Sequence, residues 1–284
     1  MSPDRKLITI FGGTGKQGGS VAHSLLQNPD FRVRVITRNA QSDASRKLAA
    51  LGADIAQGDG FSGDEMLSAF SGSWGAFVNI NSDDKVLKNK IEQYARSLGS
   101  FETFTPIGAG WFLENFLGKE VAPVFGGFPY FPDDQGYLTF RVPYWGGDEH
   151  VPWLSISDDF GDIVQGIFLD PGRWNGHFVH GVSDIRSFEQ VVADFAAVTG
   201  NKARFQPILP TWEAFDTHGI QELEDVKLMF GFTQLTGGRY FGPEDTEVDT
   251  ARQLKQITGL KLGRPEGQHK LTSARDWFAA RFAN

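Results

Sequence analysis

The sequence predicts an α/β fold, with a doubly wound parallel sheet followed by a smaller mixed α/β region. Two observations predict it. Short apolar strand patterns alternate with helix-spaced patterns through the first third of the chain, a rhythm typical of parallel sheets with right-handed crossovers. A glycine-rich turn also follows the first strand pattern directly. The length of 284 residues suits one large domain or two closely joined ones.

The expected elements of the first part are short and closely spaced. Residues 7–11 form an apolar run that ends in glycine, as buried strands do. Further strands are expected at 31–36, 53–56, 76–80 and 102–106, with helices at 20–26, 44–51, 64–70 and 86–98. After the fourth strand only one helix and one strand follow, where two of each would complete the usual sheet.

The second part has a different texture. Residues 118–150 are rich in glycine, proline and aromatic residues, which predicts ordered loops and short strands. Ser187 is the expected N-cap of a helix that stops at Gly200. The expected elements are strands at 139–143 and 176–182, and helices at 157–169, 187–199, 211–218, 220–232, 249–258 and 272–282.

The composition excludes several classes of protein. A net charge of −8 argues against a broad electrostatic grip on nucleic acid. The absence of cysteine removes disulfides, thiolate metal sites and a catalytic cysteine. We find no signal peptide and no run of about 18 apolar residues, so we expect no membrane association and a cytoplasmic protein.

The glycine-rich turn is the strongest local signal. Its glycines at 12, 15 and 18 follow a strand and open a helix, the placement that a dinucleotide site requires. Gly12 would allow the tight turn, Gly15 the approach of a pyrophosphate, and Gly18 close packing of helix on strand. The residues expected to hold the phosphates are Gly12, Thr14, Gly15, Lys16, Gln17 and Gly18. The alternative is a glycine turn without a ligand.

The end of the second strand predicts which nucleotide is bound. NAD sites place an acidic residue about 20 residues beyond the loop, to bind the ribose hydroxyls. Here that position is Arg38, preceded by Thr37. A guanidinium and a hydroxyl suit a 2′-phosphate, so we favour NADP(H) over NAD; the alternative is a solvated arginine. Asp59, after the third strand, is a weaker candidate for the adenine end.

These motifs together resemble the NmrA-like group of atypical short-chain dehydrogenases. The resemblance is carried by residues 12–18, Thr37-Arg38, Gly58-Asp59, Val78-Asn-Ile-Asn81, 88–99, 105–115, 151–161 and 174–177. It implies a Rossmann core and a smaller C-terminal domain with a cleft between them. We therefore expect residues 1–110 and about 151–182 to form the NADP-binding domain, and about 111–150 and 183–284 the smaller one. It also adds Asn79 and Asn81 as cofactor contacts.

The sequence departs from the family pattern at one place. Relatives ordinarily carry a further helix, strand and loop, roughly 40 residues by the size of a βαβ unit, between Asp84 and the helix that follows. The stretch is absent here. The chain is therefore a shortened variant, or residues are missing from it at this point. We favour the second, because removing a central strand would expose two sheet edges.

Lys88 is the remaining candidate for proton transfer. The Tyr-x-x-x-Lys pair of short-chain dehydrogenases is absent, since no tyrosine has a lysine four residues later. The Lys-x-x-Ile spacing at Lys88 is similar to isoflavone-reductase-like relatives, in which the lysine acts near the nicotinamide. An exposed helix lysine is the alternative interpretation.

The sequence is rich in aromatic residues. There are 25 Phe, 7 Trp and 5 Tyr, or 13% of the chain, and they either fill a core or line a pocket. The residues proposed for a substrate pocket are Trp111, Phe112, Asn115 and Trp153. No metal site is expected, because His177 and His180 would face opposite sides of a strand.

Two functions remain open from the sequence. One is an NADPH-dependent reductase of a hydrophobic small molecule, aromatic or polyketide-like, for which the aromatic residues and Lys88 argue. The other is a non-catalytic NADP(H) sensor that acts through a regulatory protein partner, for which the missing Tyr-x-x-x-Lys argues. The sequence leans to the reductase and leaves the oligomeric state open.

Overall fold

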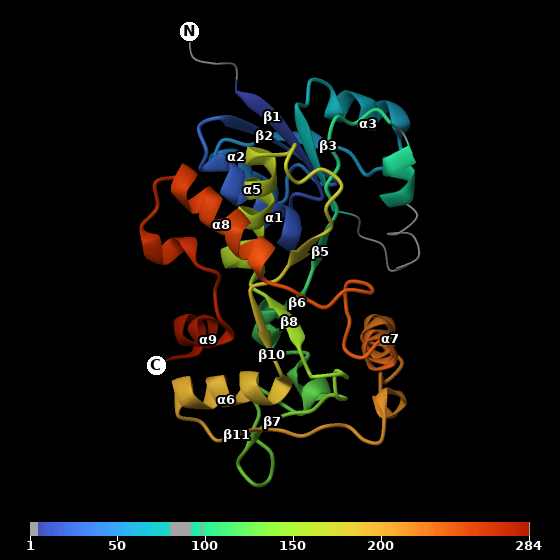
Figure 1. Ribbon diagram of the computed structural model, residues 1–284, viewed down its shortest axis with the longest axis vertical. Coiled ribbons are helices and arrows are strands. Elements are labelled where there is room, and N and C mark those ends of the chain that lie inside the picture. Colours follow the sequence, from blue (N-terminus) through green and yellow to red (C-terminus); the bar gives the residue numbers. More distant parts are fainter. Residues whose placement is uncertain (1–4, 80–91, 98, 284) are drawn as a thin grey trace. The chain divides into compact units, whose positions relative to one another are not determined.

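The computed structural model describes residues 5–79, 92–97 and 99–283, and the chain forms two compact units (Figure 1). Unit 1 comprises Met1–Ile107, Ile156–Val179 and Ala251–Leu271, and unit 2 comprises Gly108–Ser155, His180–Thr250 and Thr272–Asn284. The expected domain limits differ from these units in four places. Residues 108–110, 151–155 and 180–182 lie in unit 2, and residues 251–271 lie in unit 1.

Unit 1 contains a parallel sheet of four strands in the described residues, in the order β3-β2-β1-β4. The strands are β1 (Lys6–Phe11), β2 (Phe31–Thr37), β3 (Asp54–Gln57) and β4 (Gly75–Val78). Phe11 lies beside both Ile36 and Val78, so the strands end at a common edge. Ile10 and Val35 are fully buried, as expected for a sheet covered on both faces. The predicted α/β fold with a Rossmann-type parallel sheet is confirmed.

The helices between these strands begin in two different ways. α2 (Asp43–Ala50) and α3 (Gly63–Phe70) each follow a serine, Ser42 or Ser62, whose hydroxyl accepts a backbone N–H of the first turn. α1 (Lys16–Leu26) follows Gly15, which offers no side-chain cap, and its first turn carries no acidic residue. The start of α1 is therefore the one of these three left open to an external anion.

Two glycines bring three helices together. α5 (Gly161–Leu169) packs against α1, and Figure 1 shows α8 (Asp249–Lys261) beside α5. A Cβ at Gly161 would lie 2.2 Å from the carbonyl oxygen of Ser20, and one at Gly166 would lie 2.5 Å from that of Leu254. The helices approach this closely because these positions lack side chains.

Buried ion pairs attach residues 251–271 to unit 1. Lys255 pairs with Asp159, which lies in the π-helical turn η3 (Ile156–Phe160) just before α5, and both side chains are buried. Arg264 pairs with Asp162 at 2.5 Å. These contacts join residues about 100 apart in the chain, so a pattern along the sequence does not show that this segment groups with the sheet.

The strand expected at 102–106 does not form. Residues 92–97 are helical, but strand structure begins only at β5 (Ile107–Ala109), which pairs with β9 (Val179–Gly181). The Phe104 N–H donates to the side chain of Asn175, and the Thr105 hydroxyl donates to the Trp174 carbonyl. The segment therefore bonds irregularly to a loop rather than in a ladder.

Unit 2 is built from short strands and helices. β10 (Asp184–Arg186), β8 (Val151–Leu154) and β6 (Trp111–Phe112) form one sheet in that order, and β7 (Leu138–Phe140) pairs with β11 (Ala203–Phe205). Its helices are α6 (Phe188–Thr199), α7 (Gln221–Leu235) and α9 (Ala274–Phe282), with short turns η1 (Leu113–Leu117), η2 (Ala122–Phe125) and η4 (Trp212–Ala214); η5 (Glu266–His269) belongs to unit 1.

The predicted ends of helix α6 are confirmed, whereas the helix predicted at 211–218 does not form. The Ser187 hydroxyl accepts the Gln190 N–H in a capping box, and Gly200 ends α6 with φ 72°. The helix expected at 211–218 is only the turn η4. Asp216 accepts the His218 N–H and His218 adopts φ 50°, so a local turn replaces the helix.

Many of the aromatic residues fill the core of unit 2. Trp153 and Trp145 both stack on Trp111, with centroid distances of 5.3 and 6.0 Å. Phe128 packs edge-on against Phe195 at 4.8 Å. Such pairs add to the stabilisation that comes from burying large apolar surfaces.

Among the helices that the structure describes, none is long and apolar enough to cross a membrane.

Candidate functional site

The glycine turn between β1 and α1 is sterically dependent on its glycines. Gly12 adopts φ +74°, in the left-handed region. A Cβ at Gly18 would lie 2.4 Å from the carbonyl oxygen of Gly12, and one at Gly13 would lie 2.6 Å from a methyl group of Val35. The turn therefore folds tightly onto the sheet, with the start of α1 directly against it.

The start of α1 can bind an anion. The first N–H groups of a helix have no partner within the helix, and its dipole favours negative charge there. These are the N–H groups of Lys16, Gln17 and Gly18. The Lys16 side chain is exposed and adds a positive charge. The arrangement matches the needs of a pyrophosphate.

The strand ends bring the other predicted residues to the same edge. The Thr14 and Thr37 hydroxyls lie 3.4 Å apart and hydrogen-bond, which ties the glycine turn to the end of β2. Arg38 follows and is exposed, and in the described part of the chain no hydrogen bond or ion pair engages its guanidinium. The Asp59 carboxylate is exposed and accepts the Phe61 N–H at 2.8 Å.

Asn79 follows β4 directly and lies against the glycine turn. Its N–H donates to the Phe11 carbonyl at 3.4 Å, extending the pairing of β4 with β1. Its Cβ lies 3.7 Å from where a Cβ of Gly12 would be. The sequence analysis named Asn79 as a cofactor contact only through the family resemblance. The residues themselves also indicate it, because Asn79 directly follows a strand of the parallel sheet. Asn81 and Lys88 lie outside the described residues.

The residues predicted for a substrate pocket take different positions in unit 2. Trp153 is 1% exposed and its indole N–H donates to the Arg186 carbonyl at 3.0 Å, so its place is in the core rather than on a pocket wall. Trp111 is partly buried and packs between two other tryptophans. Phe112 is partly buried and Asn115 is exposed, so both keep accessible surface.

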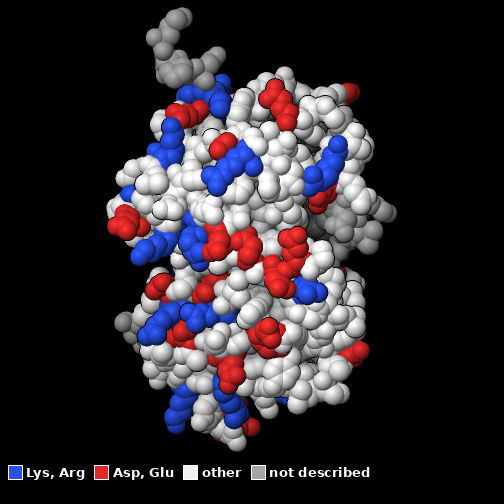
Figure 2. Space-filling view, viewed as in Figure 1, with Lys and Arg blue, Asp and Glu red and all other residues white. Residues whose placement is uncertain are grey.

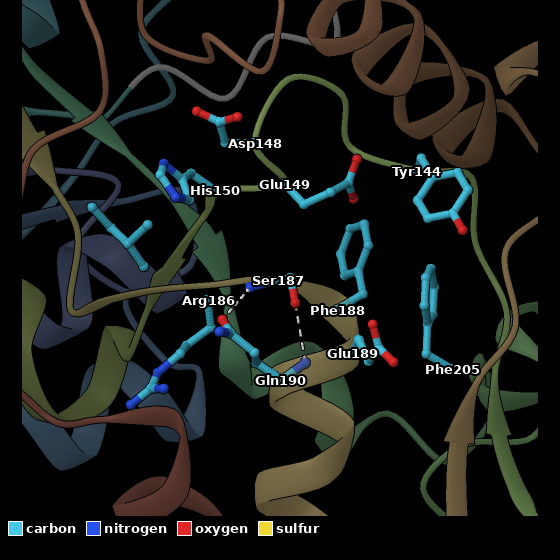
Figure 3. A pocket seen from close by; sticks show the side chains of 11 residues that line it. Tyr144, Asp148, Glu149, His150, Arg186, Ser187, Phe188, Glu189, Gln190 and Phe205 are labelled. Carbon is cyan, nitrogen blue, oxygen red and sulfur yellow. Dashed lines mark hydrogen bonds between the residues drawn. The ribbon is translucent and has the colours of Figure 1, made fainter.

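A cavity of about 400 Å³ lies elsewhere in unit 2, around the start of α6 (Figure 3). It is lined by Tyr144, Asp148, Glu149, His150, Ile185, Arg186, Ser187, Phe188, Glu189, Gln190 and Phe205. Sequence reasoning missed it, because its walls come mainly from segments about 40 residues apart, 144–150 and 185–190. The capping box occupies Ser187 and Gln190, as the dashed lines in Figure 3 show.

Glu149 shapes one wall of this cavity. Its carboxylate accepts the backbone N–H groups of Trp145 and Gly146 at 3.0 and 2.8 Å. The residue itself has φ 57°, a conformation that is costly for a side chain larger than glycine. The two hydrogen bonds hold the turn between Trp145 and Glu149.

The histidines form no metal site. In the described ranges no three His, Asp or Glu side chains are grouped so that they could hold a metal ion. His180 stacks on Phe241 at 4.5 Å, and its Nδ1 accepts the Glu247 N–H at 3.2 Å. Burial lowers the pKa of this histidine, while Glu247 and Glu244 oppose the shift. Burial therefore favours the neutral form of this packed side chain.

Charge on the surface is mixed. Figure 2 shows that lysine and arginine side chains on the face in view are scattered among acidic ones. This face therefore offers no wide basic surface, and the positive charges named for an anion are the exposed side chains of Lys16 and Arg38.

Comparison with known families agrees with the glycine turn and the sheet. The profile of the NmrA-like family matches residues 4–88 and 86–258. The chain belongs to the NmrA-like family. The two matched segments meet at residues 86–88. This is close to Asp84, after which the sequence lacks the further helix, strand and loop that relatives ordinarily carry.

Relatives of known name are oxidoreductases of this family. The chain is 84% identical, over 334 aligned positions and the full length of both chains, to the NmrA-like family domain-containing oxidoreductase lnaB of Aspergillus flavus. It is 53% identical to FrzB of Cladobotryum, with 98% of each chain covered. Because this chain has 284 residues, about 50 positions of the first alignment have no counterpart in it.

Solved structures share the fold at low identity. A crystal structure of NmrA, a negative transcriptional regulator, in complex with NADP has a TM-score of 0.67 at 18% identity, covering 98% of this chain and 97% of that one. The NADPH-dependent quinone oxidoreductase QOR2 of Escherichia coli has a TM-score of 0.60 at 18% identity, covering 97% and 99%.

Proposed function

We propose that this NmrA-like chain is an NADP(H)-dependent oxidoreductase that reduces a hydrophobic small molecule. The observation that carries the proposal is the glycine turn, whose Gly18 leaves no room for a side chain and whose helix start is uncapped. The residues present fit the cofactor: the N–H groups of α1 would hold the pyrophosphate, and Arg38 the 2′-phosphate. The relatives named as oxidoreductases support the reaction class.

The residues of this chain bind and orient, and the nicotinamide, when bound, supplies the hydride. The link between the Thr14 and Thr37 hydroxyls holds the phosphate turn and the ribose end in one register. Lys88 stays a prediction as the proton donor. The alternative of a non-catalytic NADP(H) sensor is favoured by one observation, the lack of a Tyr-x-x-x-Lys pair in the sequence.

Substituting Arg38→Glu is expected to abolish the preference for NADPH over NADH. The guanidinium would lose its charge-assisted hydrogen bonds to the 2′-phosphate, worth about 1.5–3 kcal/mol, so NADPH affinity should fall roughly 10–100-fold. Calorimetric titration with both nucleotides measures the ratio. Arg32→Glu, at the other end of β2 and paired with Asp54, is the matched control. An unchanged ratio in Arg38→Glu would remove the 2′-phosphate assignment.

The reductase itself is tested by turnover. The purified chain with NADPH and a panel of hydrophobic ketones and enones should oxidise the cofactor, followed by the absorbance of the reduced nicotinamide. Lys88→Ala should slow this oxidation by about 100-fold or more if the lysine transfers the proton. Tight NADPH binding without oxidation of any panel member would favour the sensor. Full turnover in Lys88→Ala would assign the proton to another group.

A further inference from the structure

Helix α7 carries apolar residues on two opposite faces. Leu223, Met229 and Phe230 are buried against unit 2. Leu228, Phe232 and Leu235 are 56%, 46% and 83% exposed. Their spacing of four and three residues puts these three on one side of the helix. A helix that is apolar on both sides is normally buried on both, so the outer face fits a partner.

The outer face of α7 is also hollowed. A cavity of about 410 Å³ lies at its C-terminal end. It is lined by Phe232, Leu235, Thr236, Arg239, Gly242 and Pro243. Apart from Arg239 and Thr236, this lining is apolar or glycine. The groove can therefore receive large apolar side chains of the kind that α7 itself presents.

The charges at the two ends of this face are opposite. Asp225 lies one turn before Leu228 on the same side and is partly exposed. Arg239 borders the groove beyond the other end of the helix. The helix ends at Leu235, and the chain turns at Gly237 and Gly238, with φ 66° and 86°, before it reaches Arg239. A second copy of α7 laid antiparallel across this face would bring each arginine toward the aspartate of the other copy.

We propose that the outer face of α7 binds the same face of a second copy of this chain, forming an antiparallel two-fold dimer. The apolar residues in the middle would provide the buried contact and the two Asp225–Arg239 pairs its orientation. The existing ion pair of Arg239 with Asp245 does not prevent this. Their side chains are 50% and 92% exposed, and such pairs contribute little.

The mass of the full chain in solution tests the proposal. Sedimentation of the wild type across a concentration series should show a species of twice the chain mass of 31.4 kDa. Leu235→Glu buries a charge in the contact and should raise the dimer dissociation constant at least ~30-fold. Leu67→Glu is the control, because Leu67 is 75% exposed on α3 and lies outside the proposed contact. A wild type that stays monomeric throughout would overturn the proposal.

Charge exchange tests the antiparallel orientation separately. Asp225→Arg and Arg239→Asp should each weaken the dimer by placing like charges opposite each other, and the double variant should recover most of the wild-type affinity. Circular dichroism verifies that each variant is folded. A dimer that tolerates Leu235→Glu, or in which the double variant is weaker than both single variants, would show that this pairing is wrong.

Discussion

Replacing Gly18 by alanine is expected to abolish NADP(H) binding. The new Cβ would lie 2.4 Å from the Gly12 carbonyl oxygen and 2.7 Å from the Gly13 Cα. Both are backbone atoms that cannot rotate away, so the turn or the start of α1 must move. That movement displaces the N–H groups proposed to hold the pyrophosphate. Losing two charge-assisted hydrogen bonds there would lower affinity by about 100-fold or more.

The neighbouring glycine provides the control. A Cβ at Gly19 would lie 3.5 Å from the Gly13 carbonyl oxygen, an ordinary contact. Gly19→Ala should therefore keep NADP(H) affinity and raise stability by about 0.5–1 kcal/mol, because alanine favours helix more than glycine. Calorimetric titration and urea unfolding of both variants measure the two effects. If Gly18→Ala bound NADPH like the wild type, the glycine turn would not be the phosphate site.

Lys255→Met should destabilise the protein more than any surface change. It leaves the buried Asp159 carboxylate without its lysine, and breaking a buried ion pair from one side costs about 3–5 kcal/mol. That is a large share of the roughly 5–15 kcal/mol by which a folded protein is stable. The midpoint of urea unfolding should fall accordingly. The change also removes the Lys255 hydrogen bond to the Asp158 carbonyl.

Two further variants separate the pair from general effects on α8. Lys261 lies on the same helix as Lys255 and forms a half-exposed ion pair with Asp30, which lies just before β2. Lys261→Met removes this pair and should lower the free energy of unfolding by no more than about 1 kcal/mol. Lys255→Met combined with Asp159→Leu should recover much of the loss, since no unpaired buried charge remains. Equal losses in Lys255→Met and Lys261→Met would show that the buried pair has no special role.

The glycine turn between β1 and α1 could be predicted because the residues that cause it are neighbours in the chain. Gly12, Gly15 and Gly18 sit within seven residues, and a strand and a helix on either side complete the requirement. The caps of α6 are local in the same way, with Ser187 and Gln190 three residues apart. In such cases the residues that decide the structure are neighbours in the chain, so their pattern can be read directly.

The role of the aromatic residues could not be predicted in this way. Trp153 reads equally well as a pocket residue and as a core residue, because both need a large apolar side chain. Only its stacking on Trp111 and its burial assign it to the core. The cavity at the start of α6 could not be predicted from the sequence either, because residues 144–150 and 185–190 come together only after folding.

The sequence by itself therefore determined the parallel sheet, the glycine turn between β1 and α1 and the position of Arg38 just after β2. Each depends on periodicity or spacing within a few residues, which the chain carries before it folds. The tertiary structure decided that residues 251–271 belong with the sheet, which tryptophans are core, and that α7 presents a second apolar face. These depend on which distant segments exclude water from each other, and burial is a property of the packed chain rather than of any short pattern.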